Sequence, residues 1–564
     1  MKRYKAVRVF LKVPYYAGAV ILLSITGLFD KNWYGLQKLK MGDIRDRLPL
    51  ILHYLIVGRY KGYTPHPLFI PEYFDTGARA GFVDPTIKYL LKKTLWSKPT
   101  HPYFDGSEYQ KHAEGKNPLV HFIKHANNKT ALPVEKMLKK TVVKPITYGE
   151  VRKKQTQQQE VWQQKENLRH TNKPASSYDY GRERAFVNQW VDTDLGDMVL
   201  EKPLVSIVMP SWNREKLIKE AIESLQNQTF RNWELIVGDD GSTDKTKEVI
   251  RSIAEVDPRI KLLELSHGGV CKARNAAMKA AKGDWIAFLD SDNTWTPNFL
   301  QVSIAAMQKQ NMQAAYAAVK MNEANGVRYR INEPNLELLS ISNYIDLNVF
   351  IVHKNIIKKV GYFDVQLRRA VDHDLILRVS KVAELHYLPI IGVNYTNHDE
   401  VARISNTELL SWGGVVKNKN IIDWDNVAKK RIANKTSIVV AVKNDLAAAA
   451  RCITRLVQYT DMNKVEIVIV DSSSGPSMSA LASSLSMIHA DIEYIYCPES
   501  HDLALGSNVG FAHTTGQNVV FVEQGCQVEP EWLEPLLASL KSGVGIAAPM
   551  QLAPNRTITS AGIL

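Results

Sequence analysis

Cysteine is scarce in this sequence, and long apolar runs are equally rare. The 564 residues hold four cysteines, Cys271, Cys452, Cys497 and Cys526, without a Cys-x-x-Cys pair. This spacing argues against a zinc knuckle or a disulfide-stapled scaffold and fits a reducing compartment. The most conspicuous apolar run, residues 13–29, is 17 residues long, whereas a helix needs about 20 to cross a bilayer. We therefore predict a partly buried or surface-lying helix there.

Acidic residues are sparse at the N-terminal end of the chain. Residues 1–150 contain 25 Lys and Arg against 11 Asp and Glu, whereas the remaining residues are nearly balanced, 46 against 47. The net charge of +13 therefore originates in the first 150 residues. A basic region of this kind suits an anionic partner, which could be a membrane lipid, a phosphorylated substrate or nucleic acid. The alternative is a domain that is basic without binding any of these. No nucleic-acid recognition motif accompanies the charge, so we expect no nucleic-acid partner.

Composition and apolar patterning divide the chain into four parts. Residues 1–140 contain a degenerate repeat, whose aromatic residues we expect to pack between stacked units. Residues 141–200 are rich in Lys and Gln and predict a helix followed by a linker. Residues 201–432 and 433–564 each alternate short β-branched runs with segments of helical periodicity. We predict an α/β fold in which a mostly parallel sheet occurs twice, after a mainly helical basic region.

The two α/β parts align with each other at a nearly constant offset. Asn213 corresponds to Asn444 at an offset of 231 residues, and Gly283 corresponds to Gly516 at an offset of 233. Because the offset stays steady across three strand–helix units, it indicates an internal duplication.

Polar residues follow three predicted strands of the first copy, at the edge where open parallel sheets bind ligands. Asp290 and Asp292, one residue apart after the strand 285–289, suit a hard divalent cation such as Mg²⁺ or Mn²⁺. Such a cation would neutralise a leaving diphosphate. Asp239 follows the strand 233–237 and is a candidate ligand of a ribose or base edge, with helix capping as the alternative for its neighbours.

Three further residues suggest roles in the same chemistry. Arg274 stands beside Lys272 near the start of a predicted helix, where cations are unfavourable unless an anion is bound, so both favour a diphosphate. Asp372 is a candidate general base for an acceptor hydroxyl. His398 is a candidate metal ligand or phosphate contact, although a lone histidine is more often structural.

Together these motifs resemble glycosyltransferase family 2, which has the GT-A fold, over about residues 201–405. The motifs that carry the resemblance are SIVMPSWNR (206–214), DDGSTD (239–244), ARN (273–275), GDWIAFLDSD (283–292) and GYFD (361–364), followed by Asp372. The resemblance implies a metal-dependent, inverting transferase that takes a sugar from a nucleotide-sugar donor. Many family members read Glu-Asp where this chain has Val371-Asp372, so Asp374 stays as a fallback base.

The resemblance also implies roles for individual residues. Asp239 would contact the base, Asp290 the ribose, and Asp292 the Mn²⁺ or Mg²⁺ ion, with His398 near the metal. Asp372 would be the catalytic base. The nucleotide-sugar site as a whole would comprise Pro210, Ser211, Asn213, Asp239, Arg274 and Asp290.

The N-terminal repeat more loosely resembles segments that precede such domains in bacterial capsule and O-antigen synthesis proteins. That likeness implies a glycan or lipid-linked acceptor. It also implies a location in the bacterial cytoplasm, peripheral at the inner face of the cell membrane, with residues 1–140 contacting the anionic surface.

The second copy looks impaired, because Glu523 and Gly525 replace Asp290 and Asp292. We expect an incomplete copy, and favour a fragment of a longer polymerase over a non-catalytic remnant. The main alternative function is a non-catalytic glycan-binding or scaffold protein built from degenerate transferase domains. A nucleotidyltransferase is disfavoured, because no Gly-rich basic loop follows the first strand.

Overall fold

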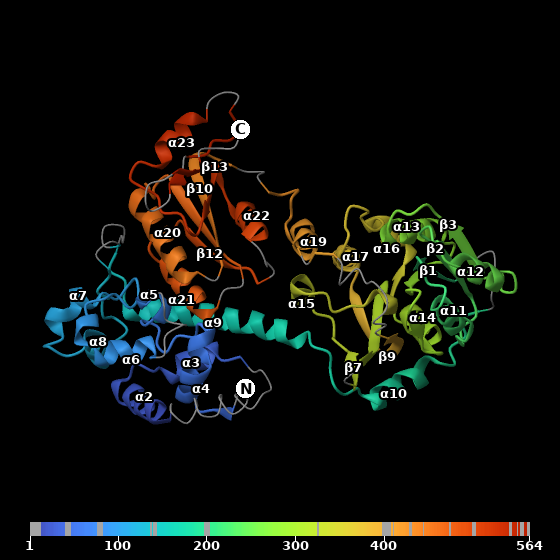
Figure 1. Cartoon of the computed structure of the whole chain (residues 1–564), viewed down its shortest axis with the longest axis horizontal. Coiled ribbons are helices and arrows are strands. Elements are labelled where there is room, and N and C mark those ends of the chain that lie inside the picture. The colour runs from blue at the N-terminus through green and yellow to red at the C-terminus, as the bar shows by residue number, and fades with distance from the viewer. Residues whose placement is uncertain are drawn as a thin grey trace. The chain divides into compact units, whose positions relative to one another are not determined.

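A computed structural model describes most of the chain and divides it into two compact units. The described residues are 13–39, 47–75, 83–135, 138, 144–196, 204–323, 326–396, 408–409, 411–427, 431–443, 445–472, 475–498, 503–540, 544–549, 551–552 and 558–560. One unit combines Met1–Asn167 with Asp423–Leu564, and the other is Leu168–Ile422 (Figure 1). The boundaries predicted at residues 140, 200 and 432 stay predictions. The grouping of the N-terminal region with the second α/β copy is a feature that the sequence did not predict.

The unit Leu168–Ile422 is built on a nine-stranded mixed sheet, in the order β3-β2-β1-β4-β8-β6-β9-β5, with β7 beside β6. The first four strands of this order are parallel, and β8 then pairs antiparallel with both β4 and β6. This confirms the predicted α/β class. The strands are β1 (Val205–Ser211), β2 (Trp233–Asp239), β3 (Ile260–Glu264), β4 (Trp285–Phe288), β5 (Thr294–Trp295), β6 (Ala314–Glu323), β7 (Gly326–Arg330), β8 (Phe350–His353) and β9 (Leu385–Thr396).

Helices cover both faces of this sheet, because successive strand residues point to opposite sides. Ile207 of β1 belongs to a core with α11 and α14, whereas its neighbour Val208 belongs to a core with α13 and α17. The helices of this unit are α10 (Tyr180–Trp190), α11 (Ile218–Gln226), α12 (Thr246–Ala254), α13 (Val270–Ala280), α14 (Phe299–Lys309), α15 (Leu336–Ile341), α16 (Lys354–Val360), α17 (Val371–Ser380), α19 (Trp412–Ile421) and the 3₁₀ turn η5 (Leu347–Val349).

The second α/β copy repeats the first four strands of that sheet. Its four-stranded sheet has the order β12-β11-β10-β13, all parallel, which matches β3-β2-β1-β4, while β14 and β15 form a separate antiparallel pair. Val205 pairs with Trp285 in the first copy, and Thr436 pairs with Asn518 in the second. These registers reproduce the offsets of 231 and 233 residues and confirm the duplication. The elements are β10 (Ile432–Val442), β11 (Val465–Asp471), β12 (Ile492–Tyr496), β13 (Gly516–Glu523), β14 (Gln551–Leu552), β15 (Ile558–Ser560), α20 (Leu446–Tyr459), α21 (Pro476–Leu485), α22 (Leu503–His513) and α23 (Leu533–Ser539).

A buried polar network at the amino end of the strands is retained in both copies. Ser206 Oγ donates to Glu234 Oε1 at 2.6 Å and accepts from the backbone N–H of Gly283 at 2.8 Å. A Cβ on Gly283 would lie only 2.7 Å from the backbone nitrogen of Ser206, so glycine is required there. The counterparts in the second copy are Ser437, Glu466 and Gly516. The duplication therefore kept the polar interactions that fix the strands.

The N-terminal region is mainly helical, as predicted, and the repeated aromatic residues are core. Tyr34, Phe69 and Phe104 are fully buried. The apolar run 13–29 forms α2, and none of the described helices combines the length and apolar composition that crossing a bilayer requires. The elements are α2 (Val13–Thr26), α3 (Lys31–Gln37), α4 (Leu50–Ile56), η2 (Gly58–Lys61), α5 (Pro71–Phe74), α6 (Pro85–Leu91), η3 (Lys93–Leu95), α7 (Gly106–Tyr109), η4 (Gln110–His112), α8 (Pro118–His125) and α9 (Tyr148–Thr171).

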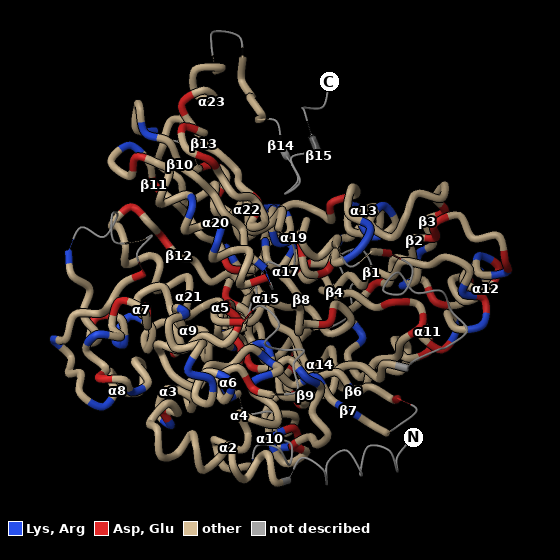
Figure 2. Tube along the Cα trace, turned by 60° about the vertical axis from the view of Figure 1, so that its left-hand side comes forward, with Lys and Arg blue, Asp and Glu red and all other residues tan. Residues whose placement is uncertain are grey.

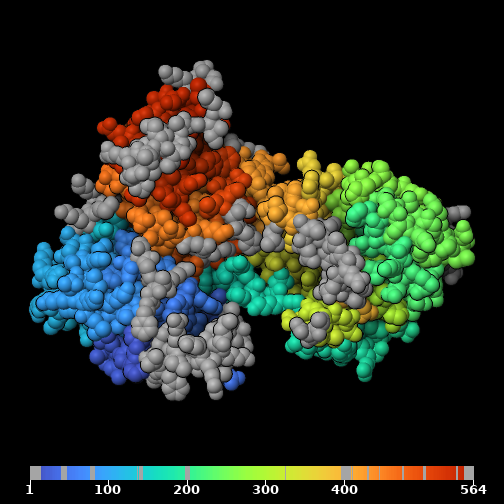
Figure 3. Space-filling view, viewed as in Figure 1, coloured from blue at the N-terminus to red at the C-terminus, as the bar shows by residue number. Residues whose placement is uncertain are grey.

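The N-terminal region and the second copy share one hydrophobic core, which contains both Phe104 and Leu481. All ten residues of α21 are buried, whereas only two residues of its counterpart α12 in the first copy are. At this junction Gln155 Nε2 donates to Ser484 Oγ at 2.7 Å, and His101 Nε2 lies 3.2 Å from the same hydroxyl. Figure 3 shows the blue surface of the N-terminal region continuing into the orange and red surface of the second copy. The two parts are therefore one folded body.

Candidate functional site

The carboxyl ends of three neighbouring strands gather the predicted nucleotide-sugar residues of the first copy. Ser211, the last residue of β1, pairs with Asp239, the last residue of β2. On the other side, Val208 of β1 pairs with Phe288 of β4, two residues before Asp290. Residues predicted from separate motifs therefore reach the same edge of the sheet, which is where parallel sheets bind ligands.

Asp239 and Asn213 are tied into the turn that follows β2. The Asp239 carboxylate is fully buried and accepts from both the backbone N–H and the hydroxyl of Ser242. Asn213 has a left-handed backbone with φ of 52°, its N–H donates to Ser242 Oγ at 2.9 Å, and its Oδ1 accepts from the Thr243 N–H. These contacts hold the walls of the site in place. Contact of Asp239 with a base stays a prediction.

An aromatic surface beside these turns was not predicted from the sequence. Trp212 is 47% exposed and its ring stacks on that of His267, with centroids 5.0 Å apart and planes 30° apart. The buried carboxylate of Asp240 holds the His267 loop by accepting from the N–H groups of Gly268 and Gly269 at 2.7 and 2.9 Å. The available signal was an aromatic residue in the loop directly after the first strand.

Arg274 of α13 forms an ion pair with Asp290. Arg274 Nη2 lies 2.7 Å from Asp290 Oδ1, and the arginine is buried while the Asp290 side chain is 34% exposed. Arg274 also lies over the ring of Phe363, 5.4 Å from its centroid. The sequence predicted that a cation here needs an anion, and the protein itself supplies a carboxylate. Contact with a diphosphate stays a prediction.

Asp290 and Asp292 are the metal-binding candidates that the structure describes at this edge. Asp292 is partly exposed, and its Oδ1 accepts from Asn293 Nδ2 at 3.0 Å. The described residues contain no group of three or more side chains suited to hold a metal ion. His398 lies outside the described residues. Mg²⁺ and similar ions often use one or two carboxylates together with waters and substrate phosphates, so this pair fits a divalent ion.

Asp372 and Asp374 occupy the first turn of α17 in very different surroundings. Asp372 is partly exposed, and its Oδ2 accepts from Asn343 Nδ2 at 2.8 Å. Asp374 is fully buried and accepts from Nε and Nη2 of Arg378, at 3.0 and 2.7 Å, and from Asn420. Burial alone would raise the pKa of Asp374, but the Asn420 hydrogen bond and the Arg378 charge hold it below its usual value. This burial excludes the fallback base from contact with an acceptor.

The corresponding edge of the second copy differs from the first at several of these positions. Ser507 and Gly525 stand at the positions of Arg274 and Asp292. The side-chain amide of Gln524, which replaces Ser291, accepts from the backbone N–H of Lys443 at 2.7 Å and donates to its carbonyl at 2.9 Å. This pair of bonds bridges the ends of β10 and β13, the gap in which the first copy places its candidate site.

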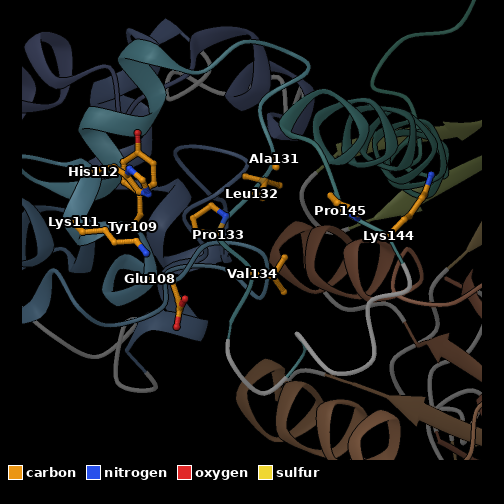
Figure 4. A pocket seen from close by; sticks show the side chains of 10 residues that line it. All are labelled: Glu108, Tyr109, Lys111, His112, Ala131, Leu132, Pro133, Val134, Lys144 and Pro145. Atoms are coloured by element: carbon orange, nitrogen blue, oxygen red, sulfur yellow. The ribbon is translucent and has the colours of Figure 1, made fainter.

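Two surface cavities lie in the N-terminal region and contain none of the predicted site residues. One of about 630 Å³ separates the Glu108–His112 turn from Lys144 and Pro145, which Figure 4 shows on opposite sides of the opening. The other, of about 390 Å³, lies between α2 and α4. Its lining is Val20, Lys31, Pro49, Leu50, Ile51 and Leu52.

Comparison with known proteins places the chain among glycosyltransferases. It is 43% identical over 125 residues to UDP-Glc:alpha-D-GlcNAc-diphosphoundecaprenol beta-1,3-glucosyltransferase WfgD of Escherichia coli, covering 22% of this chain and 49% of that protein. It is 28% identical over 256 residues to chondroitin synthase of Pasteurella multocida (strain Pm70), covering 42% and 26%. The chain thus spans about half or less of these two relatives. The structure of S. aureus TarS 1-349 in complex with UDP-GlcNAc aligns with a TM-score of 0.34 and 23% identity, covering 38% and 67%.

A family model described as glycosyl transferase family 2 matches residues 206–371 and 437–560. These two segments make up just over half of the chain and coincide with the two α/β copies. The chain therefore belongs to glycosyl transferase family 2.

Proposed function

We propose that residues 201–432 transfer a sugar from a nucleotide-sugar donor to a growing bacterial cell-surface polysaccharide or a lipid-linked acceptor. The observation that carries the proposal is the presence of Asp290 and Asp292 together at the strand ends of the first copy, where the second copy has Glu523 and Gly525. The names of the two relatives, a glucosyltransferase acting on a diphosphoundecaprenol-linked sugar and a chondroitin synthase, support an acceptor of this kind.

The strand ends would bind the donor. The exposed Trp212–His267 surface offers a flat aromatic face on which a base stacks. Asp290, oriented by Arg274, presents a carboxylate to the ribose hydroxyls. Asp292, with His398 as the predicted second ligand, would hold a divalent ion. That ion supplies positive charge which neutralises the leaving nucleoside diphosphate.

Asp372 would act on the acceptor. Its carboxylate takes the proton of the acceptor hydroxyl while the hydroxyl oxygen bonds to the anomeric carbon. The bond from that carbon to the diphosphate breaks on the opposite side, which inverts the configuration. A positioned base of this kind contributes about 10²–10⁴-fold in rate, and Asp372 combines partial exposure with an orienting bond from Asn343.

The acceptor's location would be the cytoplasmic face of the membrane, with the N-terminal region as the peripheral contact. The helix α2 contains no charged residue and is tan along its whole length in Figure 2. Ile21 and Ile25, one turn apart, are 61% and 65% exposed. An exposed apolar helix within a basic region is suited to lie on an anionic bilayer.

A non-catalytic role is the second candidate and applies to the second copy. Gln524 bridges the strand ends there, and Gly525 removes the carboxylate that a metal would need. We therefore assign catalysis to the first copy and a supporting role to the second.

Nucleotide release tests the proposal. The purified chain is offered UDP-glucose, UDP-GlcNAc and a wider panel of sugar nucleotides with Mn²⁺, with and without EDTA. We expect one donor to release its diphosphate, and expect EDTA, Asp292→Ala or Asp372→Asn to abolish the release. Glu523→Ala, at the equivalent position to Asp290 in the second copy, is the matched control and should leave the rate unchanged. No release from any donor, with a lipid-linked acceptor present, would favour the scaffold alternative.

A further inference from the structure

A short buried segment touches both halves of the proposed reaction. This segment, residues 343–348, is named the connector; it follows α15 and includes the first two residues of η5, just before β8. Tyr344, Ile345 and Leu347 are buried in the core that also holds Phe288 of β4 and Leu375 of α17. The connector is therefore anchored in the packing between the strand and the helix that carry the two candidate carboxylates.

At one end of the connector, Asn348 holds Asp290. Asn348 Oδ1 accepts from the backbone N–H of Asp290 at 2.6 Å, and Asn348 Nδ2 donates to Asp290 Oδ2 at 3.3 Å. Asp346, which is partly buried, fixes this asparagine in turn, because its Oδ1 accepts from the Asn348 backbone N–H at 3.0 Å and from Nδ2 at 2.9 Å. The Asn348 carbonyl also accepts from Trp295 Nε1 at 2.6 Å. Asn348 thus holds both the backbone and one carboxylate oxygen of Asp290, while Arg274 holds the other oxygen.

At the other end of the connector, Asn343 holds Asp372. Asn343 Nδ2 donates to Asp372 Oδ2 at 2.8 Å, and Asn343 Oδ1 accepts from the Ile345 N–H at 3.2 Å. The second bond decides which end of the amide faces the carboxylate. The adjacent His373 Nε2 donates to the carbonyl of Leu339 at 2.7 Å, so the start of α17 is tied twice to the end of α15. With Oδ2 engaged by Asn343, Oδ1 of Asp372 would be the oxygen that takes the proton of the acceptor hydroxyl in the proposed reaction.

We infer that the connector is a positioning element that fixes the separation between the donor-side carboxylate Asp290 and the base Asp372. Asn348 and Asn343 are its positioning residues, and neither needs to touch the reacting atoms. The inference rests on the proposed function, because it concerns the geometry of that reaction. Misplacing a reacting group by about 1 Å costs about 10²-fold in rate, so a rigid link between the two carboxylates has a direct kinetic consequence.

The test is a division of effects between kcat and KM, measured with the donor that the wild-type chain turns over. Asn343→Ala should lower kcat by about 10- to 100-fold and leave the donor KM within twofold, because only the base loses its orientation. Asn348→Ser should raise the donor KM about tenfold, because Asp290 loses both of its bonds to Asn348. Thermal unfolding of each variant confirms that the unit is folded.

Asn335→Ala is the matched control. Asn335 Oδ1 caps α15 by accepting from the Leu338 N–H at 2.8 Å, so its loss weakens the same helix without touching either carboxylate. A kcat loss in Asn335→Ala equal to that of Asn343→Ala would overturn the inference, as would an unchanged kcat in Asn343→Ala. These outcomes differ from failure of the proposed function, in which the wild-type chain itself releases no diphosphate.

Discussion

Two carboxylates on one turn of α17 differ in burial, since Asp374 is fully buried and Asp372 is partly exposed, and the roles proposed for them follow from that difference. Asp374 lies within a closed set of polar partners, Arg378, Lys419 and Asn420. Removing one partner of a buried ion pair costs about 3–5 kcal/mol, because the other charge stays buried without compensation. We expect Asp374→Asn to lower the free energy of unfolding of this unit by that amount, measured by chemical denaturation.

The matched variant for this prediction is Asp372→Asn, which changes a partly exposed carboxylate two residues away. It should alter the free energy of unfolding by no more than about 0.5 kcal/mol, while it abolishes diphosphate release. Equal destabilisation by both substitutions would contradict the assignment of the two roles.

A second residue with a structural charge is Glu466, in the network shared by both copies. Burial opposes its ionisation, but hydrogen bonds from Lys435, Ser437 and Thr515 lower the pKa of Glu466 to about 2. The pKa of a glutamate in an unfolded chain is about 4.3. The stabilisation from this group is therefore complete above that pH and is lost as the pH falls toward 2.

The expected result is a steeper loss of stability in acid for the wild-type chain than for Glu466→Gln. Unfolding midpoints measured between pH 5 and about pH 2.5 give both slopes. Parallel slopes in the two proteins would show that Glu466 keeps an ordinary pKa in the folded chain.

At the scale of single elements, α2 carries the prediction about the membrane. Ile21→Asp combined with Ile25→Asp places two charges on the exposed side of this helix. Burying the two isoleucine side chains in a bilayer would contribute about 3–6 kcal/mol to membrane binding. We expect partition onto vesicles containing anionic lipid to fall at least about tenfold, measured by co-sedimentation. Val256→Asp, an exposed apolar position on the other unit, controls for the added charge. Undiminished binding in the double variant would remove α2 from the contact.

The sequence predicted the helices and strands that a local apolar pattern indicates. It did not predict features that depend on contacts with distant parts of the chain. Short apolar runs between helical segments indicated β1, β2 and β4, and the placement of Asp239 and Asp290 at strand ends predicted that they reach one edge of the sheet. The antiparallel pairing of β8 could not be predicted, because the direction of a strand within a sheet leaves no local signal in the sequence. The roles of Asn343 and Asn348 were also invisible, since an asparagine pattern does not reveal which distant carboxylate it contacts. Arg274 was read as a sign of a bound anion, and its partner within the fold is Asp290.

The burial of α21 was equally beyond sequence analysis. Four of its ten residues are serines, which gave no sign that the whole helix would be buried, and its counterpart α12 has only two buried residues. Burial arises because the N-terminal repeats pack onto it. In this unit α21 therefore serves as a surface against which the N-terminal repeats pack.

For the whole molecule, the shared core predicts that segments more than 300 residues apart unfold together. Phe104→Ala in the repeats and Leu481→Ala in α21 each empty a fully buried position of the same core. Each should lower the free energy of unfolding by about 2–5 kcal/mol. Hydrogen exchange should report the loss of stability across both Met1–Asn167 and Asp423–Leu564, whichever residue is changed.

Phe288→Ala, in the core of Leu168–Ile422, should instead raise exchange in that unit alone. If Phe104→Ala loosened only the repeats, the N-terminal region and the second copy would be two folding units in contact. Concerted exchange would instead show that the second copy and the basic N-terminal region unfold as one cooperative unit.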